Sequence, residues 1–208
     1  MNYSKILEQD ICEHLCHEFE KFLSKIEDEK LRHLIREKAY FAGGCIYSLR
    51  NGREVKDYDL FLKDTEIIED LKKLDCWSYI SEYALSIGKY QVVVKYFGEP
   101  DLCVGQFDFK HNMHYYIPGE SKIRCAYMEE LDEEPEIDDF KYLETNELVF
   151  NENRARDIEG VFLRIKKFTD RGMIISKQTK KKIKQRTTKR AVKKYARTRK
   201  RGNRRSYY

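Results

Sequence analysis

The chain has 208 residues, with 41 Lys and Arg against 36 Asp and Glu, for a formal net charge of +5. This length is enough for one main domain with an appendage but not for two full domains. No window approaches the apolar length of a membrane span, and the polar, acidic N-terminus lacks the basic start and apolar centre of a signal peptide. The composition therefore predicts a cytoplasmic protein without a membrane segment.

Charge is distributed unevenly along the chain. Sixteen of the Lys and Arg residues lie from Lys177 onward, together with none of the Asp or Glu, so residues 1–176 carry a net charge of −11. We expect an N-terminal helical segment over residues 1–38, a main domain over residues 39–176 and a basic tail over residues 177–208. A tail of this composition is expected to be disordered or loosely helical when it is free.

The N-terminal segment predicts an amphipathic helix followed by a second, shorter one. Its apolar residues recur at spacings of three and four: Leu7, Ile11, Leu15, Phe19, Phe22 and Ile26. Within it, "CEHLCH" places Cys12 and Cys16 on one helical face, with His14 and His17 nearby. No second pair of ligands follows at zinc-site spacing, so a packing or surface helix is favoured over a metal site.

Strands and helices mix in the rest of the chain without strict alternation. The predicted elements are a strand in "AYFAGG", a short helix over residues 45–50, a strand in "DYDLFL", and a helix over residues 66–74. Strand-like runs follow in "YALSI", "YQVVVKYF" and "GQFDFKHNMHYYI", then an acidic loop and a helix over residues 154–171 that Gly172 ends. The pattern predicts an α/β (α+β) fold, with a small mixed sheet flanked by helices.

Two aspartates stand one residue apart in "KDYDLFL". Side chains alternate between the faces of a strand, so Asp57 and Asp59 point to the same face and could share a divalent cation. The intervening Tyr58 and the following Leu60 would then face the core. An exposed polar strand face explains the same pattern, so the two aspartates alone do not establish a metal site.

Two further features favour a phosphate and metal site. Gly43 and Gly44 lie between a strand and a short helix, where the missing side chains allow a phosphate to approach the backbone closely. Ser48 lies one turn later in the same helix. Asp108 supplies a third carboxylate in "QFDFK", where it projects from an otherwise apolar run.

This combination of a glycine pair, a D-x-D strand and a third aspartate resembles the nucleotidyltransferase superfamily, whose fold is the polymerase beta palm. The glycine pair with "KDYDL" looks like the head domain of tRNA nucleotidyltransferases and bacterial poly(A) polymerases. The segments "ALSIGKYQVVVKYFGEPD", "FDFKHNMHYY" and "FLRIKKFTDRGMII" are similar to phage-encoded, nucleotidyltransferase-like proteins. The resemblance covers residues 39–176.

The resemblance implies a Mg²⁺-dependent enzyme that moves a nucleotide from an NTP, such as ATP, to an acceptor and releases pyrophosphate. Asp57 and Asp59 would hold the Mg²⁺ bound to the triphosphate, and Asp108 would join them on a second ion of a two-metal site. Gly43, Gly44 and Ser48 would bind the nucleotide triphosphate. If the protein is encoded by a phage, the cytoplasm is that of the host.

The chain departs from the tRNA enzymes in one motif. Tyr47 and Ser48 stand where those enzymes carry an Arg-Asp pair after the glycines, and no room remains for their long helical neck, body and tail. These differences argue against addition of CCA to tRNA, whereas the carboxylates of the metal site are all present.

Basic and histidine residues outside this motif have two interpretations each. Arg164 and Lys167 on the late helix could contact phosphates or an acceptor strand, or could form a solvated helix face. His111 and His114 lie near the third carboxylate in sequence, but histidines on strands are more often packed or exposed than functional.

The basic tail has the charge density and the tyrosines expected of a segment that binds nucleic acid, and RNA is the expected partner. A localisation signal and an intramolecular contact with the acidic body are the competing explanations. Two functions therefore remain at the level of sequence. The first is a nucleotidyltransferase that acts on an RNA end or on a protein hydroxyl, and the second is a non-catalytic nucleic-acid-binding protein built on the same fold.

Overall fold

The computed structural model describes residues 7–126, 140–153 and 160–186. The chain divides into two compact units. Unit 1 comprises Met1–Thr145 and Asn151–Ala155, and unit 2 comprises Asn146–Phe150 and Arg156–Tyr208. The predicted boundaries at residues 38 and 176 differ from this division, and the domain assignment stays a prediction.

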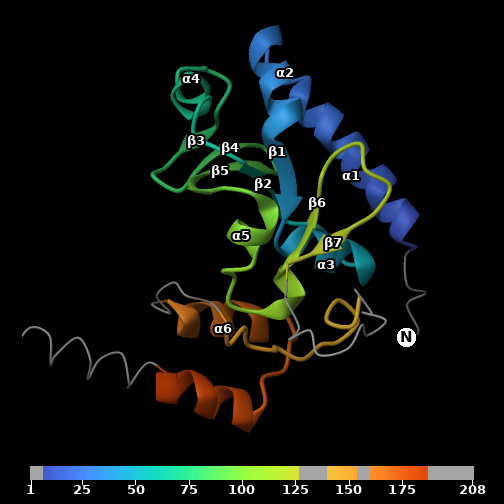
Figure 1. Ribbon diagram of the computed structural model, residues 1–208, viewed down its shortest axis with the longest axis vertical. Helices are drawn as coiled ribbons and strands as arrows, with labels where there is room; N and C mark the ends of the chain where they lie inside the picture. Colours follow the sequence, from blue (N-terminus) through green and yellow to red (C-terminus); the bar gives the residue numbers. More distant parts are fainter. Residues whose placement is uncertain (1–6, 127–139, 154–159, 187–208) are drawn as a thin grey trace, which may run out of the picture. The chain divides into compact units, whose positions relative to one another are not determined.

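Unit 1 is built on a seven-stranded mixed sheet with the strand order β3-β4-β5-β2-β1-β6-β7 (Figure 1). The strands are β1 (Ala39–Ala42), β2 (Tyr58–Leu62), β3 (Tyr79–Ile80), β4 (Ala84–Ile87), β5 (Tyr90–Phe97), β6 (His114–Tyr116) and β7 (Arg124–Cys125). Among the strand pairs of this sheet in the described residues, β2 and β5 are parallel and the others are antiparallel. The predicted fold class, a mixed sheet flanked by helices, is confirmed.

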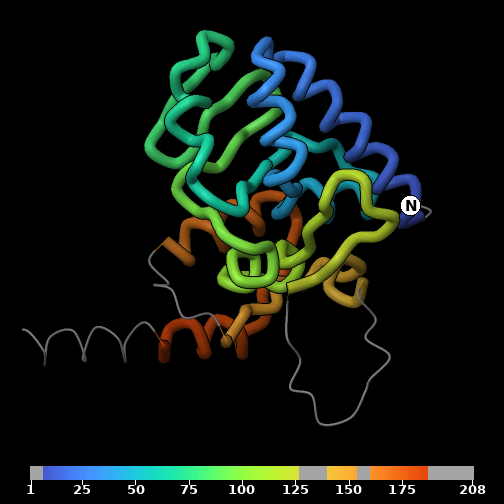
Figure 2. Tube along the Cα trace, turned by 45° about the horizontal axis from the view of Figure 1, so that its top comes forward, coloured from blue at the N-terminus to red at the C-terminus, as the bar shows by residue number. Residues whose placement is uncertain are grey.

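Two N-terminal helices, α1 (Glu8–Leu23) and α2 (Glu29–Lys38), lie together on one side of the sheet (Figures 1 and 2). The apolar stripe predicted for α1 is buried from Ile11 to Phe22. Asp28 caps α2, because its side chain accepts a hydrogen bond from the N–H of Leu31 at 2.9 Å. None of the helices in the described ranges is long and apolar enough to cross a membrane.

The α1 helix contacts one face of the sheet through aromatic and polar pairs. The Phe19 ring meets that of Phe41 edge-on at 6.0 Å, and the Phe22 ring lies 5.7 Å from that of Tyr90. Tyr90 also donates a hydrogen bond to Oε2 of the buried Glu18 at 2.9 Å. This face therefore forms the main core of unit 1.

Three short helices complete unit 1. They are α3 (Gly44–Arg50), which follows β1, α4 (Ile68–Lys72), which follows β2, and α5 (Pro100–Val104), which follows β5. The α4 helix is shorter than the predicted helix over residues 66–74. Thr65 does not cap it, because the chain turns first at Asp64, whose Oδ1 accepts a hydrogen bond from the N–H of Glu66.

The prediction of one long strand over "GQFDFKHNMHYYI" is wrong. Asp108 lies on a bend, Lys110–Asn112 form a 3-10 turn, and only His114–Tyr116 form a strand. Asn151 holds this segment in its bent shape. Its side-chain Nδ2 donates hydrogen bonds to the carbonyl oxygens of Gly105 and Phe107, and its backbone N–H donates one to the carbonyl oxygen of Asp108. The carbonyls of Gly105 and Phe107 are therefore bonded to the Asn151 side chain and not to a neighbouring strand.

Unit 2 contains α6 (Val161–Thr169) and a second helix over residues 177–186. The α6 helix ends at Thr169, and Gly172 closes the turn that stops it. Gly172 has φ +87°, its N–H donates to Thr169 O, and the N–H of Met173 donates to Phe168 O, a pairing typical of a Schellman motif. Residues 154–159 of the predicted helix and 187–208 of the tail lie outside the described residues, as does most of the predicted acidic loop.

Candidate functional site

The glycine pair forms a sharp turn at the end of β1. Gly43 has φ +87° and ψ −144°, a conformation essentially restricted to glycine. A Cβ at Gly43 would lie 3.3 Å from Oδ2 of Asp59, whereas a Cβ at Gly44 would have no atom within 4 Å. The first glycine therefore allows the chain to pass beside the Asp59 carboxylate, and the second leaves space open in front of α3.

Strand pairing explains why the glycines and aspartates meet. Phe41 pairs with Leu60 across the antiparallel ladder, so the last residues of β1 lie beside the first residues of β2. Asp59 lies on β2, and Asp57 immediately precedes it; both are partly exposed. Tyr58 and Leu60 are buried as predicted, which places the two carboxylates on the opposite face of the strand from α1.

Gln91 is a third polar residue on this face, and sequence patterns alone do not point to it. It pairs with Asp59 across the parallel β2–β5 ladder, so their side chains share a face. Its Nε2 donates a hydrogen bond to Oδ1 of Asp57 at 3.3 Å. The role of Gln91 becomes visible only when β5 is known to pair with β2. Sequence patterns do not show this pairing, because it joins segments more than thirty residues apart.

The residues beneath the aspartates form a buried network that fixes the strand. The Tyr58 hydroxyl lies 2.7 Å from Nε2 of His14 on α1, and its ring stacks on Tyr90 at 5.7 Å. Burial, with smaller contributions from Glu18 and Cys45, raises the pKa of Tyr58 to about 12. His14, which is itself exposed on α1, contacts this core at its edge. The "CEHLCH" segment is a packing element, in which burial raises the pKa of Cys12 to about 11.

Cys45, the second residue of α3, lies close to the same strand. Its thiol donates to the carbonyl oxygen of Ala42 at 3.6 Å. Complete burial, followed by the negative charge of Asp59, raises the pKa of Cys45 to about 12. The thiol is therefore protonated at neutral pH and is a poor nucleophile.

The segment that carries Asp108 lies on the carboxylate face of the sheet. The ring of Phe107 packs at 5.5 Å against that of Phe61, and Phe61 shares its face of β2 with Asp59. Asp108 itself is buried, with 6% of its surface exposed. In the part of the chain that the structure describes, no three His, Cys, Asp or Glu side chains form a group that could hold a metal ion.

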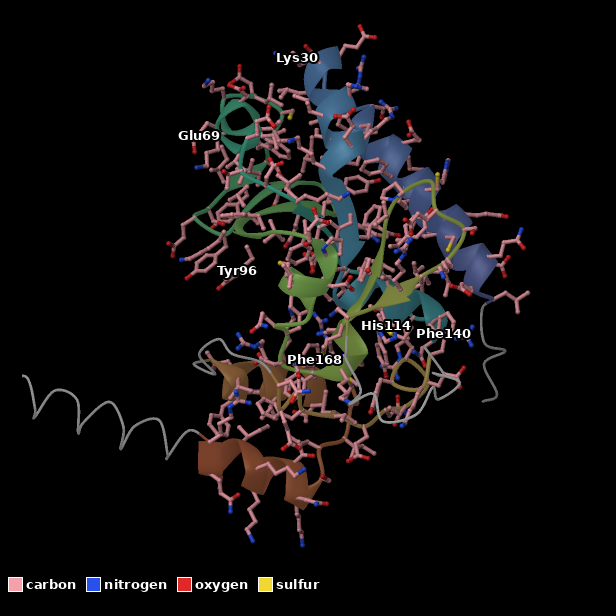
Figure 3. The ribbon with its side chains drawn as sticks, in the orientation of Figure 1. Lys30, Glu69, Tyr96, His114, Phe140 and Phe168 are labelled. Atoms are coloured by element: carbon pink, nitrogen blue, oxygen red, sulfur yellow. The ribbon has the colours of Figure 1, made fainter. Side chains whose placement is uncertain are left out.

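Tyr47 has a structural role at the position where the tRNA enzymes carry arginine. It is buried, and its hydroxyl donates to the carbonyl oxygen of Thr145 at 3.1 Å. Ser48 is half-buried on α3. Arg50, one turn further along, forms an ion pair with Glu144 at 2.7 Å and lies 4.8 Å from the ring centre of Phe140, which lies beside α3 (Figure 3). Both the tyrosine and the arginine therefore attach α3 to residues 140–145.

His111 and His114 are both buried, each with 1% of its surface exposed. The His111 ring meets that of Tyr47 edge-on at 5.1 Å and lies 6.1 Å from that of Phe109. Burial, with a smaller contribution from His114, lowers the pKa of His111 to about 3, so its imidazole is neutral at pH 7. This environment is that of a packed core histidine.

We expect His111 to make unfolding depend on pH. Unfolded histidine has a pKa of about 6.5, so between about pH 6.5 and 3 the unfolded chain binds one more proton than the folded chain. The free energy of unfolding should fall as pH is lowered through this window, by up to about 1.4 kcal/mol per pH unit. Urea titrations should show a shallower pH dependence for His111→Phe than for the wild type. An unchanged slope, or an equal change in the exposed control His33→Gln, would contradict this assignment.

Arg164 and Lys167 belong to α6 in unit 2, and the predicted carboxylates and glycines belong to unit 1. Lys167 is exposed. Arg164 is partly covered, and its guanidinium lies near Gly160, where a Cβ would be 3.4 Å from Nη1. Their contact with phosphates stays a prediction.

Solved structures of CCA-adding enzymes resemble this chain in fold. The Bacillus stearothermophilus CCA-adding enzyme in complex with CTP matches with a TM-score of 0.54 at 14% identity, over 77% of this chain and 41% of the enzyme. A second CCA-adding enzyme in complex with CTP matches with a TM-score of 0.50 at 14% identity, over 85% of this chain and 47% of the enzyme. The Thermotoga maritima CCA-adding enzyme complexed with tRNA matches with a TM-score of 0.49 at 16% identity, over 80% of this chain and 44% of the enzyme.

These similarities identify a nucleotidyltransferase-type fold, which confirms the predicted fold at the level of architecture. The chain spans less than half the length of these enzymes. No curated protein sequence matches it. The family described as "Gabija anti-defense 2 family protein" matches residues 14–132, which is more than half of the sequence and includes both glycines and all three aspartates. The chain belongs to the Gabija anti-defense 2 family.

Proposed function

We propose that the protein is a metal-dependent nucleotidyltransferase, which moves a nucleotide from an NTP to an acceptor and releases pyrophosphate. The observation that carries this proposal is the position of Gly43 against the Asp59 carboxylate. Asp57, which immediately precedes the strand, is hydrogen-bonded to Gln91, the residue that pairs with Asp59. A backbone without side chains beside a pair of carboxylates can accommodate both a triphosphate and the cation that accompanies it.

The donor chemistry of this face suits Mg²⁺. Carboxylate oxygens are hard ligands, and Mg²⁺ in phosphate sites is commonly held by one or two carboxylates together with substrate phosphates. Asp57 and Asp59 would supply these ligands. The described structure does not group Asp108 with them as a three-residue metal site, so Asp108 is proposed as the third carboxylate for the metal-bound state alone. A bound Mg²⁺ would neutralise the triphosphate charge and stabilise the leaving pyrophosphate.

Three residues of the glycine turn and α3 are proposed to position the nucleotide. Gly43 and Gly44 would bring backbone N–H groups to the triphosphate, and the open space at Gly44 leaves room for it. Ser48, half-buried on the next turn, would donate its hydroxyl to a phosphate oxygen. The buried Tyr47 cannot make such a contact, so phosphate recognition here would lack the arginine of the tRNA enzymes.

The proposed acceptor is an RNA end, and the RNA would bind through the basic tail, with Arg164 and Lys167 as additional phosphate contacts. The two CCA-adding structures named above with TM-scores of 0.50 and 0.54 are complexes with CTP, which supports an NTP as the other substrate. The family description adds a biological setting. Interference with Gabija defence agrees with the phage origin that the sequence resemblance suggests, and it makes a hydroxyl of a defence component a second acceptor to test.

Labelled NTPs test the proposed reaction directly. The purified protein would be incubated with each NTP, Mg²⁺ and total RNA, and in parallel with Gabija proteins. The expected result is label on RNA ends together with release of pyrophosphate. The competing function, nucleic-acid binding on a non-catalytic nucleotidyltransferase fold, predicts RNA binding without incorporation into either acceptor.

Gln91 offers a test of the metal face that does not depend on the acceptor. Gln91→Glu would place a third carboxylate beside Asp57 and Asp59, so like-charge repulsion should lower its melting temperature below that of Gln91→Leu. Added Mg²⁺ should reduce this difference, because a ligand that binds the folded state stabilises it. Thermal unfolding of both variants with Mg²⁺ and with EDTA measures the effect. Identical melting shifts in both variants would argue against cation binding on this face.

A further inference from the structure

The first ten residues of the basic tail fold into a helix. Residues 177–186 are helical and follow α6 in unit 2, drawn in red in Figure 1. Ser176 caps this helix, since its Oγ accepts a hydrogen bond from the N–H of Thr179 at 3.1 Å and its carbonyl oxygen accepts one from the N–H of Lys180 at 3.1 Å. The cap defines where the helix starts and so which residues share a face.

One face of this helix is covered by protein. At 3.6 residues per turn, Thr179, Ile183 and Arg186 fall on the same side. Ile183 is fully buried, and Thr179 and Arg186 are partly covered. The Arg186 guanidinium lies 5.9 Å from the ring centre of Phe150, within the same unit. The helix is therefore held in one orientation, although its sequence contains a single apolar residue.

The opposite face consists of lysines. They occur at positions i, i+3, i+4 and i+7, and all four are exposed: Lys177, Lys180, Lys181 and Lys184. The described residues of unit 2 contain ten Lys and Arg against two Asp and Glu. Within those residues no ion pair involves Lys177, Lys180 or Lys181. Like charges at this spacing destabilise a helix, so a polyanion bound to this lysine face would stabilise it.

We propose that the lysine face binds the phosphate backbone of single-stranded RNA. From Lys177 to Lys184 the helix extends about 10 Å, at about 1.5 Å per residue, so the four ammonium groups are presented together to a short stretch of phosphate backbone. Unit 2 also exposes Phe162, at 47%, among the basic residues of α6. An exposed aromatic ring among cations can stack on an unpaired base, a contact that an acidic polypeptide does not use.

This proposal differs from binding by a flexible polycationic tail, because it assigns RNA binding to four lysine side chains that lie on one face of a folded helix. It concerns the RNA partner of the proposed function, but binding is measured without NTP or Mg²⁺. A negative result here would therefore leave the nucleotide-transfer assay unaffected, and a failure of nucleotide transfer would leave this result unaffected.

Fluorescence anisotropy with a labelled single-stranded RNA tests the lysine face in the full chain. Replacing Lys177, Lys180, Lys181 and Lys184 by Gln should weaken binding at least about tenfold and make the slope of log K against log salt concentration shallower, by about 0.7 for each phosphate contact that is lost. The matched control replaces four exposed lysines of unit 1, Lys25, Lys30, Lys72 and Lys73, by Gln; Lys30 lies on α2 (Figure 3). It should bind as the wild type does. An equal loss in both variants, or no loss in the first, would overturn the proposal.

The Ile183→Ser variant distinguishes the effect of the folded helix from the effect of its positive charge. The substitution leaves every lysine in place but removes the buried anchor, so RNA affinity should fall several-fold with loss of helical circular dichroism. Unchanged affinity would show that a flexible chain binds equally well and would overturn the folded site. Competition by polyglutamate as effective as that by RNA would instead identify an acidic protein as the partner.

Discussion

Asp59→Asn is expected to reduce nucleotide transfer by about 1,000-fold while leaving the protein folded. A metal ion at a developing phosphate charge contributes several kcal/mol, and each 1.36 kcal/mol corresponds to a factor of ten in rate. The neutral amide keeps the shape of the side chain next to Gly43 but removes the negative charge that a cation requires. The rate of label transfer from NTP, measured with saturating acceptor, is the readout.

The matched control for this prediction is Asp75→Asn, which neutralises an exposed aspartate in the loop after α4. It should transfer nucleotide at the wild-type rate. Asp57→Asn should behave as Asp59→Asn does, and binding of Mn²⁺ by electron paramagnetic resonance should weaken in both. Wild-type activity in Asp59→Asn would exclude the carboxylate pair as the metal site, whatever the acceptor proves to be.

The sequence was sufficient to predict the local part of this site. The glycine turn and the alternation over Asp57, Tyr58 and Asp59 depend on neighbouring residues, and the structure has the turn, the buried tyrosine and the shared carboxylate face. Gln91 could not be predicted in the same way. Its contact with Asp57 depends on which strand lies next to β2, and the parallel pairing of β5 there is a tertiary choice.

Asp108 shows the opposite limit of sequence analysis. Its flanking phenylalanines predict a strand by alternation, yet the backbone bends because Asn151, which lies far along the chain, bonds to three carbonyl groups around it. The tail is a similar case. Its composition predicts disorder or a loose helix, but Ser176 caps a helix and one buried isoleucine anchors it, so ten of its residues have a defined structure. Amino-acid composition does not report such individual contacts, so it could not predict either local structure.

Gly43→Ala is expected to damage both stability and activity. A residue with a Cβ at φ +87° and ψ −144° costs on the order of 1–3 kcal/mol in backbone strain. The added Cβ would also lie 3.3 Å from Oδ2 of Asp59, so either the carboxylate or the turn must shift. The required shift is a few tenths of an ångström, and a misplacement of about 1 Å at a reacting centre can cost about 100-fold in rate, so kcat should fall by less than about 100-fold. Urea unfolding and steady-state kinetics measure the two effects.

Gly44→Ala distinguishes backbone strain at this turn from the loss of open space beside it. Gly44 is the first residue of α3, and its missing side chain faces a volume with no atom within 4 Å, so alanine should leave the free energy of unfolding unchanged or slightly higher. If the triphosphate occupies that volume, the added methyl group should raise KM for NTP with little change in kcat. Equal stability losses in Gly43→Ala and Gly44→Ala would show that the turn tolerates neither side chain for reasons unrelated to Asp59. A Gly43→Ala variant with normal stability and kcat would remove the argument that this turn is built around the carboxylate.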